Sequence, residues 1–352
     1  MTDLNSEIPW ASFCMSTYRR TGFLRETLAL IRAQTFLSFE VVVSDNDPEG
    51  SAAAVVAEFQ DPRFRYFHNE TNLGMVKSFN KSLERSRGQY IVLLPDDDPV
   101  YPNMLQTLYD LQVKYPGYGQ YIGGHDTVFK GLLQARMAKA HIGTNSSLAD
   151  WELGAEKVYS AGEFPEVFLN GTFGGGLLFS VGAVRRDIAI TVGGFPDYGT
   201  PHLADCSFTL LSGAIAGVVH VNTEVGCRTI HDENYSYSEA NYESLYKAPE
   251  GFYQWTLERL PPAMNTPYLR ELLSHYCGRD MTFLVISIKK MLLLQKVNSE
   301  KFETFRRRFF DLALLKKWRR KYYISVHFPN AFEVFLAFRK MLFPPSPNKT
   351  GK

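Results

Sequence analysis

The stretch Gln89-Tyr90-Ile91-Val92-Leu93-Leu94-Pro95-Asp96-Asp97-Asp98 decides the fold class of this chain of 352 residues. Its apolar part, between Gly88 and Pro95, predicts a buried strand, and three carboxylates follow where that strand ends. Open α/β sheets bind their ligands at the carboxyl ends of their strands. Adjacent carboxylates repel one another, and a divalent cation offsets that cost. The stretch therefore predicts a metal or ligand site, with a solvated acidic turn as the alternative.

Apolar runs and helical spacings alternate around this stretch. Strands are expected at Trp10–Met15, Phe39–Ser44 and Phe64–Phe67, and helices at Phe23–Gln34, Gly74–Arg87 and Pro102–Tyr115. This alternation predicts an α/β fold with a mostly parallel sheet that helices cover on both faces. Residues 124–160 are expected to carry loops, and the chain from Ala248 onward is expected to be helical. The glycines of Gly171–Gly176 let backbone approach a ligand closely or form a plain turn.

Composition narrows the function classes. The net charge of +1 argues against bulk nucleic-acid binding. The four cysteines show no CxxC spacing, so neither a zinc site nor a disulfide framework is expected. The first residues, Met1–Glu7, have neither a basic nor an apolar leader region, and no run approaches the ~20 apolar residues of a spanning helix. These features predict a cytoplasmic protein.

Five separated pieces of the chain resemble, in order, the motifs of glycosyltransferase family 2. They are Ser12–Arg20, Glu40–Asn46, Asn72-Leu73-Gly74 followed by Asn80, Leu94–Asp98, and Gly193-Gly194-Phe195 followed by Ala204-Asp205. The resemblance implies a GT-A fold and an inverting transfer of a sugar from a nucleoside diphosphate. It places the catalytic domain at residues 8–240, with a nucleotide-sugar half at 8–123 and an acceptor half at 124–240. A helical extension is expected at residues 241–352.

The resemblance also implies a metal site. Asp97 and Asp98 would hold Mg²⁺ or Mn²⁺, and His231 would be a further ligand, with a polar surface histidine as the alternative. Hard oxygen ligands suit both ions, and an imidazole suits Mn²⁺. Such an ion would neutralise the charge that develops on the diphosphate as the glycosidic bond breaks.

A set of residues along these motifs is expected to bind the nucleotide sugar, with UDP- and dTDP-sugars favoured. Asp45 would accept a hydrogen bond from the base, although Asp45-Asn46-Asp47-Pro48 is also a good turn sequence, and Asp96 would lie near the ribose. The full set is Ser16, Thr17, Tyr18, Arg20, Asp45, Asn72, Gly74, Lys77, Asn80, Asp96, Asp97 and Arg228.

Asp205 is the expected catalytic base. Inversion needs one group that takes the proton of the acceptor hydroxyl as it attacks. Asp205 begins an apolar helical stretch, so a helix-capping role is the alternative. The chain departs from the family pattern at Ser16, Arg19, Pro95 and Ala204, which leaves the metal geometry and the assignment of the base open.

The end of the chain is basic and aromatic. From Lys301 to Lys352 there are 13 Lys and Arg against 3 Asp and Glu, interleaved with aromatic residues as in Phe332–Phe343. This mixture favours peripheral binding to an anionic membrane surface over a solvated helical extension or a nucleic-acid site. It suggests an acceptor that is a saccharide or a polyprenyl-linked saccharide, used in cell-surface polysaccharide synthesis. Processive synthesis is not expected, because the Gln-x-x-Arg-Trp motif is missing. The alternative function is a nucleotide-sugar-binding or scaffold protein without turnover.

Overall fold

The protein is built around one mixed sheet. The structure, a computed structural model, describes residues 8–130, 143–146, 152–171, 173, 178–231, 234, 242–293, 298–318 and 323. In these residues nine strands form a sheet with the order β3-β2-β1-β4-β8-β5-β9-β7, and β6 pairs with β5. Strands β1 to β5 and β9 run in one direction, whereas β6, β7 and β8 run in the other. The predicted α/β fold with a mostly parallel sheet is confirmed.

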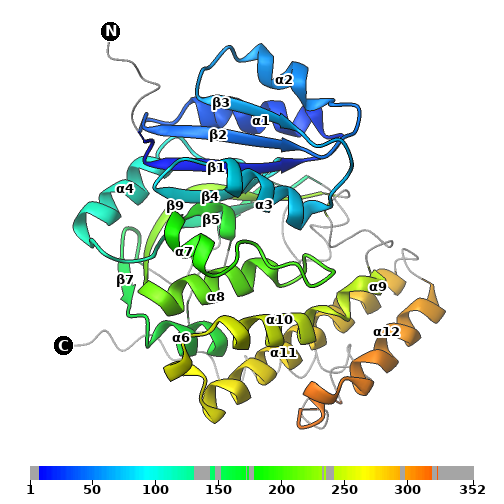
Figure 1. Ribbon diagram of the computed structural model, residues 1–352. Helices are drawn as coiled ribbons and strands as arrows, with labels where there is room; N and C mark the ends of the chain where they lie inside the picture. The colour runs from blue at the N-terminus through cyan, green and yellow to red at the C-terminus, as the bar shows by residue number, and fades with distance from the viewer. Residues whose placement is uncertain are drawn as a thin grey trace.

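The N-terminal half of the sheet is entirely parallel. It consists of β1 (Ala11–Thr17), β2 (Phe39–Asp45), β3 (Phe64–His68) and β4 (Tyr90–Pro95). Helices α1 (Thr21–Arg32), α2 (Ala52–Glu58) and α3 (Met75–Arg85) connect them. The chain steps outward from β1 to β3 and then back to β4, so right-handed crossovers put α3 on the opposite face from α1 and α2. Figure 1 shows this two-sided cover.

The second half contains strands that the sequence pattern did not indicate. They are β5 (Gln120–Phe129), β6 (Gly143–Ser146), β7 (Glu156–Tyr159), β8 (Gly182–Arg185) and β9 (Val218–Ile230). The expectation of loops over residues 124–160 was therefore wrong where β5, β6 and β7 lie. Gly123 and Gly124 interrupt the apolar pattern of β5, and a Cβ at Gly123 would lie 2.4 Å from Val225 Cγ2. The glycines hide the strand but permit its close approach to β9.

Helices cover this half and continue into the C-terminal extension. They are α4 (Met104–Lys114), α6 (Phe164–Asn170), α7 (Arg186–Thr191), α8 (Ala204–Ala216), α9 (Tyr242–Leu245), α10 (Ala248–Arg259), α11 (Pro267–Leu293) and α12 (Ser299–Asp311). In the described residues beyond Ala248 the chain is helical, as predicted. Gly171 caps α6 with a φ of 74°, and the rest of Gly171–Gly176, apart from Phe173, lies outside the described residues.

The extension packs against the sheet domain instead of standing apart from it. Helix α10 packs on α8, α11 on α6, and α12 on α11 (Figure 1). One hydrophobic cluster runs from Trp10 to Leu315 and includes Phe252 and Met281 of the extension. A boundary near residue 240 stays a prediction. The helices described by the structure include none with the length and apolar character needed to cross a membrane.

Candidate active site

Three parallel strands end level with one another and begin the candidate site. Thr17 of β1 lies opposite Asp45 of β2, and Ser16 lies opposite Pro95 of β4. The Thr17 hydroxyl donates a hydrogen bond of 2.7 Å to Asp96 Oδ2. The acidic triplet thus leaves β4 at the carboxyl edge of the sheet, as the sequence predicts, and its first member is tied to β1.

Arg20 joins the first two carboxylates of the triplet. Its Nη1 lies 2.7 Å from Asp96 Oδ1 and 2.9 Å from Asp97 Oδ2. Burial raises the pKa of Asp96 to about 6, although the Arg20 charge opposes that rise. The Thr27 hydroxyl also holds the Asp96 carbonyl oxygen at 2.8 Å. A single guanidinium therefore offsets the repulsion that the sequence places between two neighbouring acids.

Asp97 pairs with His231, which comes from the end of β9. The two atoms Asp97 Oδ2 and His231 Nε2 are 3.0 Å apart, and both side chains are buried. Burial opposes ionisation, but the hydrogen bond with His231 and the charge of Arg20 keep the pKa of Asp97 below its usual range. The imidazole stacks on the Phe23 ring, with 4.7 Å between the ring centroids. The backbone N–H of His231 donates to Asn234 Oδ1 at 2.6 Å. The ring is fixed with one nitrogen toward the triplet.

Asp98 faces a different set of donors. Ser180 Oγ donates to its Oδ2 at 3.0 Å, and the Thr229 backbone N–H donates to its Oδ1 at 3.1 Å. Burial and the nearby Asp97 charge raise the pKa of Asp98 to about 7. The Cys227 N–H donates to the Pro99 carbonyl at 2.8 Å, which joins the segment after the triplet to β9. The assignment of Asp98 as a metal ligand stays a prediction.

The residues partly fit a divalent cation. Among the described residues, no three His, Cys, Asp or Glu side chains gather as a metal site. Asp97 and His231 nevertheless present an oxygen and a nitrogen donor side by side, an acceptable pair for Mn²⁺. Mg²⁺ in phosphate-transfer sites commonly takes one or two carboxylates and completes its shell with phosphate oxygens and water. Two protein ligands would therefore be enough if phosphate oxygens and water completed the shell.

Asp45 is more deeply engaged than a base-contacting residue needs to be. It has no exposed surface, and its carboxylate accepts hydrogen bonds from the N–H groups of Asp47 and Ala52, at 2.9 and 3.0 Å. The Tyr66 hydroxyl donates a third, at 3.0 Å. This carboxylate therefore orders the turn and the start of α2, as the turn interpretation expects, and a contact with a base stays a prediction.

Asn46 is a residue that the motif analysis did not single out. Its Nδ2 donates to the Gly74 carbonyl at 3.1 Å, and its Oδ1 accepts from the Leu73 N–H at 3.3 Å. Gly74 has a φ of +81°, and its N–H donates to Asn72 Oδ1 at 2.9 Å. Asn46 thus shapes the Asn72-Leu73-Gly74 loop at the ligand edge. Its position directly after Asp45 was the available signal.

The other residues predicted to bind the nucleotide sugar differ in their exposure to solvent. Tyr18 is 41% exposed, the Lys77 side chain is 65% exposed, and Arg228 is exposed on β9. Ser16 is half-buried at the end of β1. Asn80 instead pairs with backbone: its Nδ2 donates to the Phe195 carbonyl and its Oδ1 accepts from the Phe195 N–H, both at 2.8 Å. These bonds use both ends of the Asn80 amide.

Asp205 lies in the first turn of α8, as expected. The preceding Leu203 has a left-handed φ of 64°, and the Cys206 N–H donates to Asp205 Oδ1 at 2.8 Å. Asp205 is half-buried, so its carboxylate keeps access to solvent. Leu203 is the N-cap of α8, so Asp205 is the second residue of the helix, where the helix dipole favours a carboxylate. Its role as a base stays a prediction.

Comparison with known proteins supplies the family. Residues 12–180 match the family model described as Glycosyl transferase family 2. The chain contains a glycosyltransferase family 2 domain. The resemblance expected from the sequence motifs is confirmed, and the match contains β1 after Ala11, all of β2 and β4, and the acidic triplet.

Individual relatives of this family 2 domain agree. A GalNAc(5)-diNAcBac-PP-undecaprenol beta-1,3-glucosyltransferase of Campylobacter jejuni is 27% identical over 164 residues, 46% of this chain and 52% of that protein. The succinoglycan biosynthesis protein ExoO of Rhizobium meliloti is 28% identical over 102 residues, 29% of each chain. The first curated relatives are matched over 34%, 35% and 52% of their own length, so the chain spans about a third to a half of them.

A solved structure confirms the fold. TarS residues 1–349 of S. aureus in complex with UDP-GlcNAc superpose with a TM-score of 0.63 at 16% identity. The superposition covers 90% of this chain and 81% of that one. The expected GT-A fold is confirmed, and the likeness includes much of the helical extension.

Proposed function

We propose that the protein transfers a sugar from a nucleoside diphosphate donor, UDP- or dTDP-linked, to a saccharide acceptor with inversion. The observation that carries this proposal is the convergence of Arg20, Asp97 and His231 at the level ends of β1 and β4. Known relatives support it: one solved neighbour holds UDP-GlcNAc, and one curated relative is named as a GalNAc(5)-diNAcBac-PP-undecaprenol beta-1,3-glucosyltransferase.

The donor side follows from charge. The diphosphate gains negative charge as it leaves, and cations placed where that charge develops stabilise the transition state. Asp97 and His231 would hold a Mg²⁺ or Mn²⁺, with Asp98 adjacent, and the ion would supply that neutralisation. Arg20 Nη1 lies 2.9 Å from Asp97 Oδ2, so its guanidinium would stand beside the diphosphate and add a second positive charge there.

The acceptor side needs a base, for which Asp205 is the proposed residue. The carboxylate lies in the first turn of α8, and Asn80 holds Phe195 in the Gly193-Gly194-Phe195 segment that precedes it. A carboxylate there would take the proton of the attacking hydroxyl. The hydroxyl of an acceptor bound on this side would attack the anomeric carbon of the donor sugar from the face opposite the leaving diphosphate. The new bond would form as the bond to the diphosphate breaks, which inverts that carbon.

The acceptor is proposed to be a polyprenyl-linked saccharide at the cytoplasmic face of a membrane, used non-processively in cell-surface polysaccharide synthesis. The basic and aromatic composition of residues 301–352 supports this part. In the described part of that region, Phe302 and Phe305 are buried against the extension. The aromatic stretch Phe332–Phe343 lies outside the described residues.

The test is a panel of nucleotide sugars, with and without Mn²⁺ or Mg²⁺, read by thermal shift and by slow release of nucleoside diphosphate. One donor should stabilise the protein in a metal-dependent way, and Asp97→Asn should abolish that stabilisation and the release. Asp110→Asn is the matched control, because this exposed carboxylate on α4 accepts a hydrogen bond from Gln106 of the same helix and belongs to none of the predicted site residues. Donor binding without turnover, even with saccharide acceptors, would favour the nucleotide-sugar-binding alternative.

A further inference from the structure

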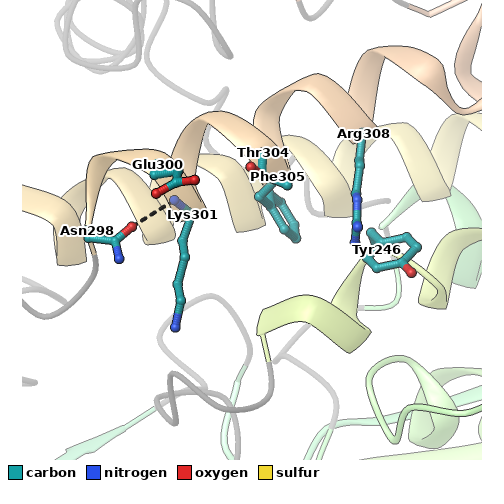
Figure 2. A pocket seen from close by; sticks show the side chains of 7 residues that line it. All are labelled: Tyr246, Asn298, Glu300, Lys301, Thr304, Phe305 and Arg308. Atoms are coloured by element: carbon teal, nitrogen blue, oxygen red, sulfur yellow. Dashed lines mark hydrogen bonds between the residues drawn. The ribbon is translucent and has the colours of Figure 1, made fainter.

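A cavity lies in the helical extension, away from the acidic triplet. It has a volume of about 260 Å³ and is lined by Tyr246, Asn298, Glu300, Lys301, Thr304, Phe305 and Arg308. All but Tyr246 belong to α12 or its N-cap, and Tyr246 directly follows α9 (Figure 2).

Arg308 is the residue that gives the cavity its chemistry. Its guanidinium carbon lies 4.2 Å from the centroid of the Tyr246 ring. Within the described residues no carboxylate forms an ion pair with Arg308, whereas Arg306 is paired with Glu303 at 2.6 Å. Stacking fixes the plane of a guanidinium while leaving its N–H fork available for an oxyanion. Arg308 is therefore held ready for a phosphate or a carboxylate.

The rest of the lining is suited to a sugar. Lys301 adds a second cation, and Figure 2 shows the Lys301 and Arg308 side chains extending from α12 on the same side as Tyr246. Glu300 and Thr304 offer oxygen atoms that hydrogen-bond with hydroxyls. Phe305 and Tyr246 supply apolar ring surface. Small-molecule sites combine such surface with a few polar groups. The volume of about 260 Å³ is just below the usual range of such sites, which suits a single monosaccharide unit.

We propose that this cavity binds an anionic saccharide unit, one monosaccharide that carries a phosphate or a carboxylate. The inference deepens the proposed function, on which it rests for its role: the unit would belong to the acceptor and would be held apart from the reacting hydroxyl. Arg308 binds the anionic group through its N–H fork, and the two aromatic residues contact the ring. The site would raise the affinity for acceptors that have such a unit.

The experiment titrates the full chain, without donor, with glucose 1-phosphate, glucuronic acid, glucose and inorganic phosphate, followed by calorimetry. Glucose 1-phosphate or glucuronic acid should bind, and glucose should bind at least about tenfold more weakly, because a hydrogen bond to a charged group is lost. Arg308→Gln should lower the affinity for the anionic sugars by a similar factor, and Arg308→Lys should keep part of that affinity. Arg307→Gln, an exposed neighbour on α12, is the control and should bind like the wild type.

Three outcomes would overturn the proposal: equal binding of glucose, unchanged binding by Arg308→Gln, or inorganic phosphate binding as tightly as glucose 1-phosphate. Circular dichroism of each variant identifies a folding defect, and Arg308→Lys keeps the test valid if Arg308→Gln does not fold. A parallel titration with UDP reports on the donor site alone. Failure of the cavity proposal is thus distinguishable from failure of the transferase proposal.

Discussion

His202 and Asp280 form an ion pair that joins the helical extension to the turn before α8, with His202 Nε2 2.9 Å from Asp280 Oδ2. Asp280 lies on α11, and His202 lies three residues before Asp205. The Tyr198 hydroxyl donates to the His202 carbonyl at 2.8 Å, and the Tyr276 hydroxyl of α11 donates to Cys206 Sγ at 3.2 Å. The extension therefore helps to position the candidate base.

Replacing Asp280 with Asn should lower the free energy of unfolding by about 3 kcal/mol. Removal of one partner leaves the other charge in a largely buried position, which costs more than a surface pair contributes. Urea unfolding measures the change. Glu271→Gln is the control on the same helix: its pair with Lys317 is about half exposed on each side, so its loss should cost less than about 1 kcal/mol. Equal effects of both changes would contradict the buried-pair interpretation.

The same pair predicts a pH dependence of stability. Burial lowers the pKa of His202, but the charges of Asp280 and, more weakly, Asp205 outweigh it, so the pKa lies above its usual value. A raised histidine pKa contributes stability that is complete below about pH 6.5 and is lost as pH rises through the folded value. Urea midpoints measured from about pH 6 upward should fall for this reason. The Asp280→Asn variant should show a smaller fall over the same range.

A substitution of Asn80 distinguishes a structural role from the predicted role in nucleotide binding. If its amide only joins α3 to Phe195, Asn80→Ala should lower the free energy of unfolding by about 1–3 kcal/mol and leave UDP affinity unchanged, because two backbone groups lose their partner. Chemical unfolding and UDP titration measure both quantities. A large loss of UDP affinity with little loss of stability would instead support the predicted nucleotide contact.

Gly194 should not tolerate a side chain. It has a φ of +72°, and an added Cβ would lie 2.5 Å from Asn80 Oδ1. Gly194→Ala should therefore cost about 1–3 kcal/mol of stability through backbone strain and displacement of Asn80. Gly22→Ala is the control, since nothing lies within 4 Å of its added Cβ near the start of α1. That change should be neutral or stabilise by up to about 1 kcal/mol in thermal unfolding.

The strands that could be predicted from the sequence are those with a local pattern of apolar residues. The first strands and the triplet were predictable, because β1, β2 and β4 are mainly apolar runs, interrupted only by Ser12 and Glu40, and polar residues stand at or directly after their ends. Strand β9 was not: over Val218–Ile230 it mixes His220, Asn222 and Glu224 with apolar residues, and it is defined by its partner β5. Long-range pairing, rather than local propensity, forms that part of the sheet.

The site divides in the same way. The motifs identified Arg20, the triplet and His231 as members, but not their pairing. That pairing depends on β9 returning beside the segment that follows the triplet, where Val100 and Gly226 form a bridge. The roles of Asn46 and of the His202–Asp280 pair were also hidden, because a hydrogen-bonded side chain 28 or 78 residues from its partner leaves no periodic signal. Only the folded chain places those groups together.

Arg20 occupies the position where a cation is needed, which makes it a probe of the metal proposal. Its Nη1 contacts Asp96 and Asp97, whose side chains are only 3% and 9% exposed. In metal-free protein, Arg20→Gln should lower the free energy of unfolding by about 3 kcal/mol, because two buried carboxylates lose their counter-charge. Added Mn²⁺ should then raise the melting temperature of this variant more than that of the wild type.

Arg25→Gln is the control, because it removes an exposed pair with Glu58. It should change stability by less than about 1 kcal/mol and leave the Mn²⁺ response unchanged. If Mn²⁺ shifts the wild type and Arg20→Gln equally in thermal unfolding, the cation does not bind at these carboxylates.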